Sequence, residues 1–203
     1  MIDNIGVGVS RETIDRLEAF SALTVKWTMK INLISKSSVP DIWNRHIIDS
    51  AQIFQYAKEV VHWVDIGSGG GFPAIVLAIM AKEVAPFTKF TLIESDARKC
   101  TFLRTAIREF DLNAYVITQR IEDVEAQCAD VVSARALGGL PDLLPHIKRH
   151  ISPTGSALLM KGRKYASELE VVSGSWDFDL VEYPSITDPE SRILLLKRIT
   201  RVG

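Results

Sequence analysis

The sequence has few of the residues that cross-link or metallate small proteins. It contains two cysteines and four histidines among 203 residues. Cys100 and Cys128 lie far apart and form no C-x-x-C pair, which favours reduced thiols over a disulfide or a zinc site. A chain of this length buries enough surface to fold without such links. We therefore expect no bound metal and a reducing compartment, the cytoplasm.

Targeting segments and long apolar segments are also lacking. The amino terminus shows no basic stretch followed by an apolar core, so no signal peptide is visible. No apolar run approaches the roughly 20 residues that cross a bilayer. With 47% hydrophobic and 24% charged residues, the composition is that of a globular protein without a membrane partner.

A large net charge is missing as well, since 24 basic and 25 acidic residues sum to −1. This argues against indiscriminate coating of nucleic acid. It leaves room for a local basic patch, because the net charge and the surface field are different quantities. The sequence gives no indication of self-association, and we expect a monomer.

Apolar spacing predicts a helical cap over residues 1–58 and one α/β domain over residues 59–203. From Ser10 to Ile34 apolar residues recur at spacings of three and four, which is typical of a helix with Ser10 as its N-cap. A second cap helix is predicted over 41–57, after Pro40.

Beyond residue 60, short apolar runs alternate with helical segments. Strands are predicted at 60–66, 90–93, 114–117, 130–133 and 157–160, helices at 73–81, 96–110, 140–150 and 164–171, and a final strand pair within 176–199. Such alternation predicts a Rossmann-like, doubly wound α/β sheet with helices on both faces. The final pair predicts an antiparallel hairpin at the sheet edge.

A glycine-rich loop, Asp65-Ile-Gly-Ser-Gly-Gly-Gly-Phe-Pro, follows the first predicted strand of this sheet. Glycines in that position let the backbone turn sharply and approach a ligand closely. The loop lacks the terminal G-K-[ST] of a phosphate-binding loop. Taken alone, it also fits a dinucleotide site or a tight turn.

Acidic residues at the ends of the strands narrow this choice. Asp65 precedes the glycines with Ile66 between them, at the end of the strand, where methyltransferases commonly place an acid near the amino-acid part of their cofactor. Glu94 ends the next strand, where a carboxylate can accept hydrogen bonds from both ribose hydroxyls, a device that NAD enzymes share. After the third strand, Ile121 and Glu122 either meet an adenine or form a solvated turn. The combination favours S-adenosylmethionine, which carries no phosphate.

Seven strings of the sequence, in order, resemble a known family. They are KINLIS, RHIIDS, VDIGSGGGFP, LIESDARKCTFLR, RIEDV, VVSARAL and LLMKGRK, within about residues 26–170. The chain resembles the 16S ribosomal RNA guanine-N(7) methyltransferases, once named glucose-inhibited division protein B. The resemblance implies a class I S-adenosylmethionine-dependent methyltransferase that modifies a loop guanine near the decoding region and releases S-adenosylhomocysteine. Its partner would be 16S rRNA or the small ribosomal subunit.

The resemblance also implies a set of cofactor contacts. Together with the two acidic residues named above, the residues expected to contact the cofactor are Asp65, Gly67, Gly69, Phe72, Glu94, Ile121, Glu122 and Arg135. Arg135 ends a strand predicted to be buried, and a buried guanidinium needs a partner. It either pairs with Asp65 or Glu122, or contacts the methionine carboxylate or the RNA.

Four basic residues are expected on the RNA side. Arg45 and His46 resemble a basic pair near the mouth of the family's pocket, the first meeting phosphate and the second the target base. The alternative is a surface ion pair and a half-buried imidazole. Lys161 and Arg163 follow a strand on the side of the glycine loop, where they grip RNA phosphate or serve as solvated loop charges.

The reaction implied by the family needs little acid–base chemistry. The N(7) atom of guanine has a lone pair and no hydrogen, so no general base is required and no residue is expected to be strictly catalytic. Positioning and electrostatics should supply the acceleration. Three alternatives stay open: a methyltransferase acting on a small molecule or protein, an NAD-binding module, and a structural ribosome-binding protein without cofactor.

Overall fold

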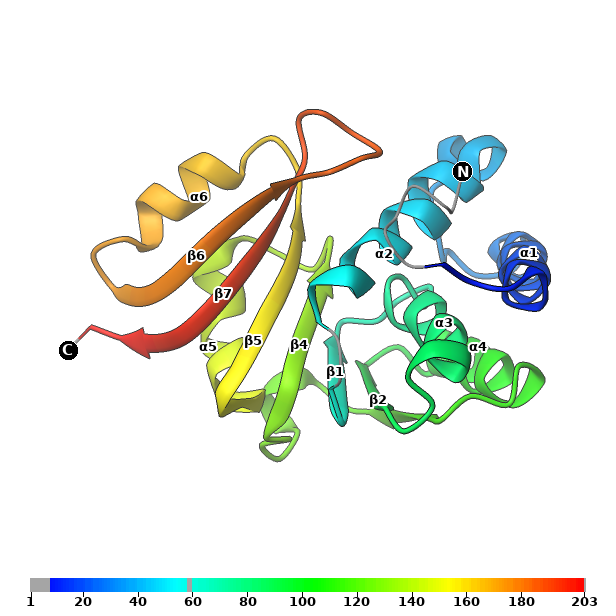
Figure 1. Ribbon diagram of the computed structural model, residues 1–203, viewed down its shortest axis with the longest axis horizontal. Helices are drawn as coiled ribbons and strands as arrows, with labels where there is room; N and C mark the ends of the chain where they lie inside the picture. The colour runs from blue at the N-terminus through cyan, green and yellow to red at the C-terminus, as the bar shows by residue number, and fades with distance from the viewer. Residues whose placement is uncertain (1–7, 58–59, 203) are drawn as a thin grey trace.

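The computed structural model describes residues 8–57 and 60–202 and arranges their strands in one sheet (Figure 1). The strands are β1 (His62–Ile66), β2 (Lys89–Glu94), β3 (Ala114–Thr118), β4 (Ala129–Arg135), β5 (Ile151–Lys161), β6 (Trp176–Pro184) and β7 (Arg192–Arg201). The longer helices are α1 (Arg11–Thr28), α3 (Ala74–Val84), α4 (Ala97–Glu109), α5 (Leu140–His150) and α6 (Tyr165–Val172). The predicted strands and helices of the α/β part are all present, and their ends lie within a few residues of the predicted ones except in β5, which begins six residues before its predicted start at Ala157.

The order of the strands determines where a ligand can bind. It is β3-β2-β1-β4-β5-β7-β6, in which β1 to β5 run parallel and β7 runs antiparallel to both of its neighbours. The predicted antiparallel hairpin is confirmed, with β7 rather than β6 inserted next to β5. The chain moves outward from β1 to β3 and then returns to β4. A crevice therefore opens at the carboxyl ends of β1 and β4, the usual ligand position in such sheets.

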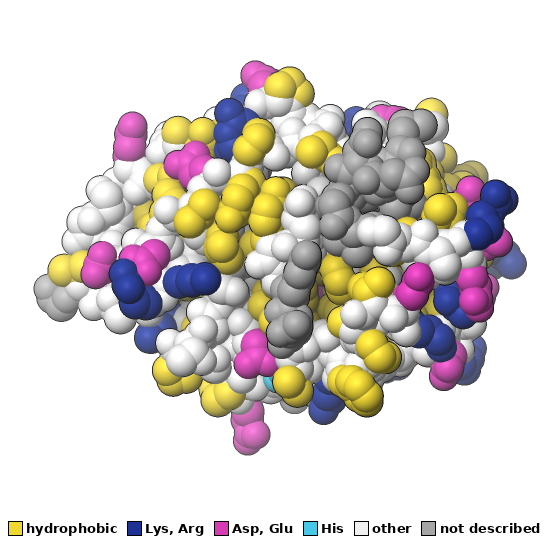
Figure 2. Space-filling model, in the orientation of Figure 1, with side chains coloured by type: hydrophobic (Ala, Val, Ile, Leu, Met, Phe, Trp, Pro, Cys, Tyr) yellow, Lys and Arg dark blue, Asp and Glu magenta, His cyan; other side chains and the backbone are white. Residues whose placement is uncertain are grey.

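Helices cover both faces of the sheet, as predicted (Figure 1). One buried cluster joins one face to α3, α4 and the cap, and a second joins the other face to α5 and α6. The first eight residues of α3 are all buried, because this helix lies between the sheet and the cap. Figure 2 shows basic and acidic side chains interspersed on the face turned to the viewer, in keeping with the small net charge.

The cap is joined to the rest by a continuous core. Helix α1 begins after Ser10, the predicted N-cap, whose hydroxyl accepts from the Thr13 amide at 3.3 Å. Glu83 of α3 accepts hydrogen bonds from Ser10 and Thr13, and so fixes the start of α1 to the domain. Phe20 stacks on Phe102 of α4 with ring centroids 6.2 Å apart. The α1 helix ends at Thr28, short of the predicted end at Ile34.

The second cap helix is irregular, contrary to the prediction of one helix over 41–57. The segment consists of 3₁₀ turns η2 (Lys36–Asp41) and η4 (Gln52–Tyr56), the π-helical η3 (Trp43–Ile48) and one short turn α2 (Asp49–Ala51). Ile42 and Ile47 are both buried and lie five residues apart, the spacing that a π turn places on one face. Apolar spacing therefore predicted the extent of the segment but not its geometry.

Candidate functional site

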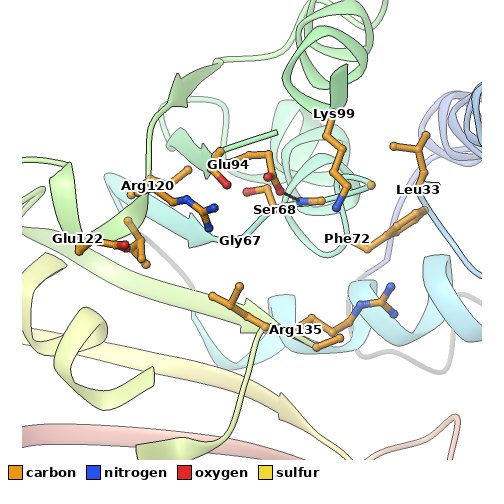
Figure 3. Close-up of a pocket in the computed structure, with 16 residues that line it drawn as sticks. Leu33, Gly67, Ser68, Phe72, Glu94, Lys99, Arg120, Glu122 and Arg135 are labelled. Atoms are coloured by element: carbon orange, nitrogen blue, oxygen red, sulfur yellow. Dashed lines mark hydrogen bonds between the residues drawn. The ribbon is translucent and has the colours of Figure 1, made fainter. Parts of the chain in front are cut away.

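A cavity of about 360 Å³ opens beside the glycine loop at the carboxyl ends of the parallel strands (Figure 3). Its walls include seven of the eight residues predicted to bind the cofactor: Gly67, Gly69, Phe72, Glu94, Ile121, Glu122 and Arg135. These residues come from four different segments of the chain. The fold thus brings together what the sequence had separated by up to 68 residues (Gly67 to Arg135).

The glycine loop needs its glycines for two measurable reasons. Gly67, Gly69 and Gly71 have φ angles of +69°, +54° and +81°, which side-chain-bearing residues rarely adopt. A Cβ atom on Gly67 would lie 2.4 Å from Cδ1 of Leu137. The loop is held against β2, because the amides of Gly67 and Ser68 donate to the Ile93 carbonyl at 2.9 and 3.1 Å.

Glu94 shapes the loop and offers acceptors to the cavity. Its Oε2 accepts from the Gly69 amide at 2.9 Å, and its Oε1 accepts from the Asp96 amide at 2.8 Å. Each carboxylate oxygen can accept a further hydrogen bond. Glu94 can therefore hold the loop and still receive two hydroxyl groups of a ligand, as the sequence predicted for a ribose.

Asp65 lies beneath the loop, with 1% of its surface exposed, and is not one of the described residues that line the cavity. Its Oδ1 accepts from Ser133 Oγ at 2.6 Å, while its Oδ2 is buried without a partner in the described part of the chain. Burial raises the pKa of Asp65 to about 6, opposed by the hydrogen bond from Ser133. A buried carboxylate with one free oxygen suits a ligand that brings a cationic group to this loop.

Arg135 lies where the cofactor cavity meets its neighbour. Its ion-pair partner is Asp49 of the cap, with Nη1 to Oδ2 at 3.1 Å, and not Asp65 or Glu122 as the sequence had suggested. Nη1 also donates to the Arg45 carbonyl at 3.1 Å. Desolvation lowers the pKa of Arg135, and the nearby carboxylate of Asp49 opposes that shift. The cap therefore holds this buried guanidinium in place.

His46 is the second side chain that holds Arg135. Its Nδ1 accepts from Arg135 Nη2 at 2.5 Å, and its Nε2 lies 3.0 Å from Ser38 Oγ, which itself donates to the Ser35 carbonyl. Burial, with the charges of Arg135 and Arg45, lowers the pKa of His46 to about 3. The imidazole is thus neutral, with its proton on Nε2, and both nitrogens are engaged within the protein. This matches the half-buried imidazole that the sequence left open as an alternative.

The ring of Phe72 completes the junction. The guanidinium of Arg135 lies 5.3 Å from the ring centroid, within the range of a cation–π contact. The imidazole of His46 lies 4.9 Å from the same ring. Phe72 therefore contributes its face to the group that orients Arg135, in addition to lining the cavity.

A second cavity, of about 690 Å³, adjoins the first and shares Leu33, Arg135 and Ala136 with it. Its walls come from the cap, from the end of β5 and from the loop between β6 and β7. Of the residues predicted on the RNA side, Arg45, His46 and Lys161 line it. Arg163 lines a smaller neighbouring depression instead and is largely exposed.

The two basic residues after β5 differ sharply in their surroundings. Lys161 is 8% exposed, and its Nζ lies 2.6 Å from Glu168 Oε2 and 2.7 Å from the Gly138 carbonyl. Its ammonium ties β5 to α6 and to the β4–α5 loop, and contact with a phosphate would require it to leave these partners. Arg163 is 76% exposed, and its ion pair with Glu190, itself 62% exposed, is long at 3.8 Å, so its guanidinium is available to an anion.

Several lining residues were missed by sequence reasoning. They are Leu33, Ser68, Gly70, Ile93, Ser95, Lys99, Arg120, Ala136 and Leu137. Lys99 from α4 and Arg120 from the start of η5 (Ile121–Asp123) reach into the cavity in Figure 3. Each stands in a string that also holds a predicted residue: Lys99 shares LIESDARK with Glu94, and Arg120 shares QRIED with Ile121. These strings are the signal that could have found them.

Two further properties bear on the kind of site. Among residues 8–57 and 60–202, no three His, Cys, Asp or Glu side chains gather as a metal site would require. In the same part of the chain, no helix is long and apolar enough to cross a membrane.

Comparison with known proteins identifies the family. Residues 13–194 match the profile of GidB, rRNA small subunit methyltransferase G. The chain belongs to this family. The ribosomal RNA small subunit methyltransferase G of Jannaschia sp. (strain CCS1) is 48% identical over 187 residues, which are 92% of this chain and 89% of the relative. That of Ruegeria sp. (strain TM1040) is 46% identical over 199 residues, 98% and 97% of the two chains. The family predicted from the seven strings is confirmed.

Solved structures with low sequence identity share the fold. The O-methyltransferase from Bacillus cereus in complex with SAH aligns with a TM-score of 0.61 and 12% identity, over 90% of each chain. TYW2 from M. jannaschii in complex with AdoMet aligns with a TM-score of 0.59 and 16% identity, over 86% of this chain and 80% of TYW2. The predicted Rossmann-like sheet of the methyltransferase type is thereby confirmed.

Proposed function

We propose that this protein transfers a methyl group from S-adenosylmethionine to the N(7) atom of a guanine in 16S rRNA of the small ribosomal subunit. The observation that carries the proposal is the family match over residues 13–194, together with a cofactor cavity that opens past Arg135 into a larger second cavity. S-adenosylmethionine supplies an electrophilic methyl group on a sulfonium. The chain's residues must hold the two reactants in line.

The cavity and the carboxylate beneath its glycine loop offer a partner for each part of that cofactor. The carboxylate of Glu94 receives the ribose hydroxyls, and Ile121 with Glu122 meets the adenine. Arg135 faces the carboxylate of the methionine part, while Asp65, beneath the loop, attracts its ammonium group. These assignments are supported by the lining of the cavity and by the buried, unpartnered Oδ2 of Asp65.

Catalysis follows from holding and orienting rather than from proton transfer. The N(7) lone pair is free at neutral pH, so no side chain has to remove a proton before attack. The Arg135, Asp49 and His46 group is hydrogen-bonded before the substrate arrives and need not reorganise during reaction. Such pre-ordered charges in a buried site are worth more than the same charges in water.

The RNA side of the proposal rests on exposed cations. Arg45 and Arg163 are exposed and can meet phosphates, whereas Lys161 acts by holding the β4–α5 loop and His46 acts by holding Arg135. Contacts to phosphate give affinity that falls with salt. We further propose that the protein works as a monomer in the cytoplasm, where its ribosomal partner is.

The test is transfer of label from S-adenosyl[methyl-³H]methionine to small-subunit rRNA, followed by chromatography of the digested nucleosides. We expect the label in N(7)-methylguanosine. Arg135→Ala should lower the rate about 100-fold or more, because a buried, charge-assisted contact is lost. Arg11→Ala, on the exposed face of α1, is the control and should keep full activity. Label in protein or in another nucleoside would overturn the proposal.

A further inference from the structure

The second cavity has no assigned occupant, and one carboxylate on its wall has no partner in the described part of the chain. We propose that this cavity takes the target guanine and that Asp41 recognises its Watson–Crick edge. The inference rests on the proposed function, since it concerns the base that is methylated. A cavity of about 690 Å³ lies within the range of sites that enclose a small ligand.

Three carboxylates line this cavity, and two of them are occupied within the protein. Asp49 accepts from Arg135 Nη1 at 3.1 Å through Oδ2, and from Thr187 Oγ1 at 2.7 Å through Oδ1. Asp188 accepts from the Glu190 amide at 3.0 Å and from a serine hydroxyl at 2.7 Å. Both side chains are therefore committed to building the cavity.

Asp41 is the third of these carboxylates. It ends η2 and is exposed to solvent, and its side chain has no hydrogen bond or ion pair to residues 8–57 or 60–202. It lies four residues before Arg45, whose carbonyl receives Arg135. Asp41 is thus a free anionic acceptor one turn away from the junction of the two cavities.

Guanine fits such an acceptor better than the other bases do. Its N1–H and 2-amino group are adjacent donors that match the two oxygens of a carboxylate, whereas adenine presents an acceptor at N1. N(7) lies on the opposite side of the purine from these donors. A base held by Asp41 therefore turns N(7) away from Asp41, and the proposal requires that N(7) then faces Arg135, which lines both cavities.

The same contact gains strength during the reaction. As the N(7) lone pair forms the new N–C bond, the C–S bond breaks and its electron pair stays on sulfur, which becomes neutral. The purine takes up the positive charge. A carboxylate bound to N1–H and to the 2-amino group stabilises that charge more than it stabilises the neutral base. Asp41 should consequently raise kcat as well as lower KM.

The cavity is already assembled to receive a base. Gln52 of the cap donates to Ser185 Oγ at 3.1 Å and accepts from the Ile186 amide at 2.9 Å, so the β6–β7 loop is fastened to the cap. Thr187 adds its hydrogen bond to Asp49. These contacts join segments more than 130 residues apart, and they fix the β6–β7 loop, which lines the same cavity as η2.

The experiment compares guanosine with inosine at the methylated position of small-subunit rRNA. Inosine keeps N(7) and N1–H but lacks the 2-amino group. For the natural chain we expect kcat/KM to be about 10-fold lower with inosine, the value of one hydrogen bond to a charged group. For Asp41→Ala we expect a loss of about 100-fold with guanosine, and the same rate with inosine as with guanosine.

Two controls make the result decisive. Asp15→Ala removes an exposed carboxylate of α1 that pairs with Arg11, and should keep the natural discrimination. S-adenosylhomocysteine should bind Asp41→Ala with unchanged Kd in calorimetry, which shows that the variant is folded. An equal inosine penalty in the natural chain and in Asp41→Ala would overturn the role of Asp41 and leave the proposed function standing. Failure of the natural chain to methylate guanosine would instead overturn the proposed function, and this inference with it.

Discussion

Replacing Asp65 with Asn should change the pH dependence of stability in a calculable way. The carboxylate is fully buried, and its pKa is raised to about 6 from an ordinary value of 3.8. The folded state therefore binds this proton more tightly than the unfolded state does. The contribution of Asp65 to the unfolding free energy is therefore greatest at low pH, and it is lost as the pH rises through the pKa of the folded state.

The size of the effect follows from that difference in pKa. About 2 pKa units correspond to roughly 3 kcal/mol for the whole titration, at about 1.4 kcal/mol per unit. According to the linkage relation, about 2 kcal/mol of this unfolding free energy is lost between pH 4.5 and pH 7.5. The Asn amide has its own cost in the buried site, about 1–3 kcal/mol for unpaired donors. That cost does not depend on pH and cancels when two pH values are compared.

Urea unfolding at pH 4.5 and pH 7.5 measures the difference directly. Relative to the natural chain, Asp65→Asn should gain about 2 kcal/mol of unfolding free energy on going to pH 7.5. His46 titrates equally in both proteins and drops out. The control is Asp96→Asn, because hydrogen bonds from Arg98 lower the pKa of the partly exposed Asp96 and its stabilisation is lost only below this pH window. An unchanged difference between the two pH values would show that Asp65 is not a buried, poorly paired carboxylate. The variant should also bind S-adenosylhomocysteine about 10-fold more weakly, since the ligand's ammonium loses its counter-charge.

Three further predictions concern the loop and the two cavities. Gly67→Ala places a methyl group 2.4 Å from Leu137 at a φ of +69°, and calorimetry should show S-adenosylhomocysteine bound about 10-fold more weakly; unchanged affinity would contradict the assignment of the loop. Lys161→Met strands Glu168 and should lower the unfolding free energy in urea by about 3 kcal/mol, with the salt dependence of RNA binding preserved; the reverse pattern would make Lys161 a phosphate contact. His46 should remain neutral with its proton on Nε2 down to pH 5 in ¹⁵N NMR, and a midpoint near pH 6.5 would refute its placement between Arg135 and Ser38.

Much of the fold could be predicted because its strands, helices and glycine loop have characteristic local sequence patterns. Strands that are buried on both faces appear in the sequence as apolar runs. The glycine loop after β1 is recognisable because few other structures require several glycines so close together. Glu94 could be placed because the carboxyl ends of parallel strands meet at one edge of the sheet. The α5 helix was predicted with its observed ends.

The partners of the charged residues were not predictable in the same way. The ion pair between Arg135 and Asp49 joins residues 86 apart, and nothing in the spacing of either string specifies it. Lys161 was predicted either to grip RNA phosphate or to serve as a solvated loop charge, because its place in the sequence does not reveal the ion pair that it forms with Glu168 of α6. Apolar periodicity indicates which face of an element is buried, whereas ion pairs depend on how separate elements dock.

The most direct test of the proposed function is mass spectrometry of 16S rRNA from cells with and without this protein, mapped to single nucleotides. Methylation at N(7) of one loop guanine should be present with the natural chain, absent without it, and restored by supplying the gene again. It should not be restored by the Arg135→Ala variant. An unchanged inventory of N(7)-methylguanosine in the cells that lack the protein would contradict the account.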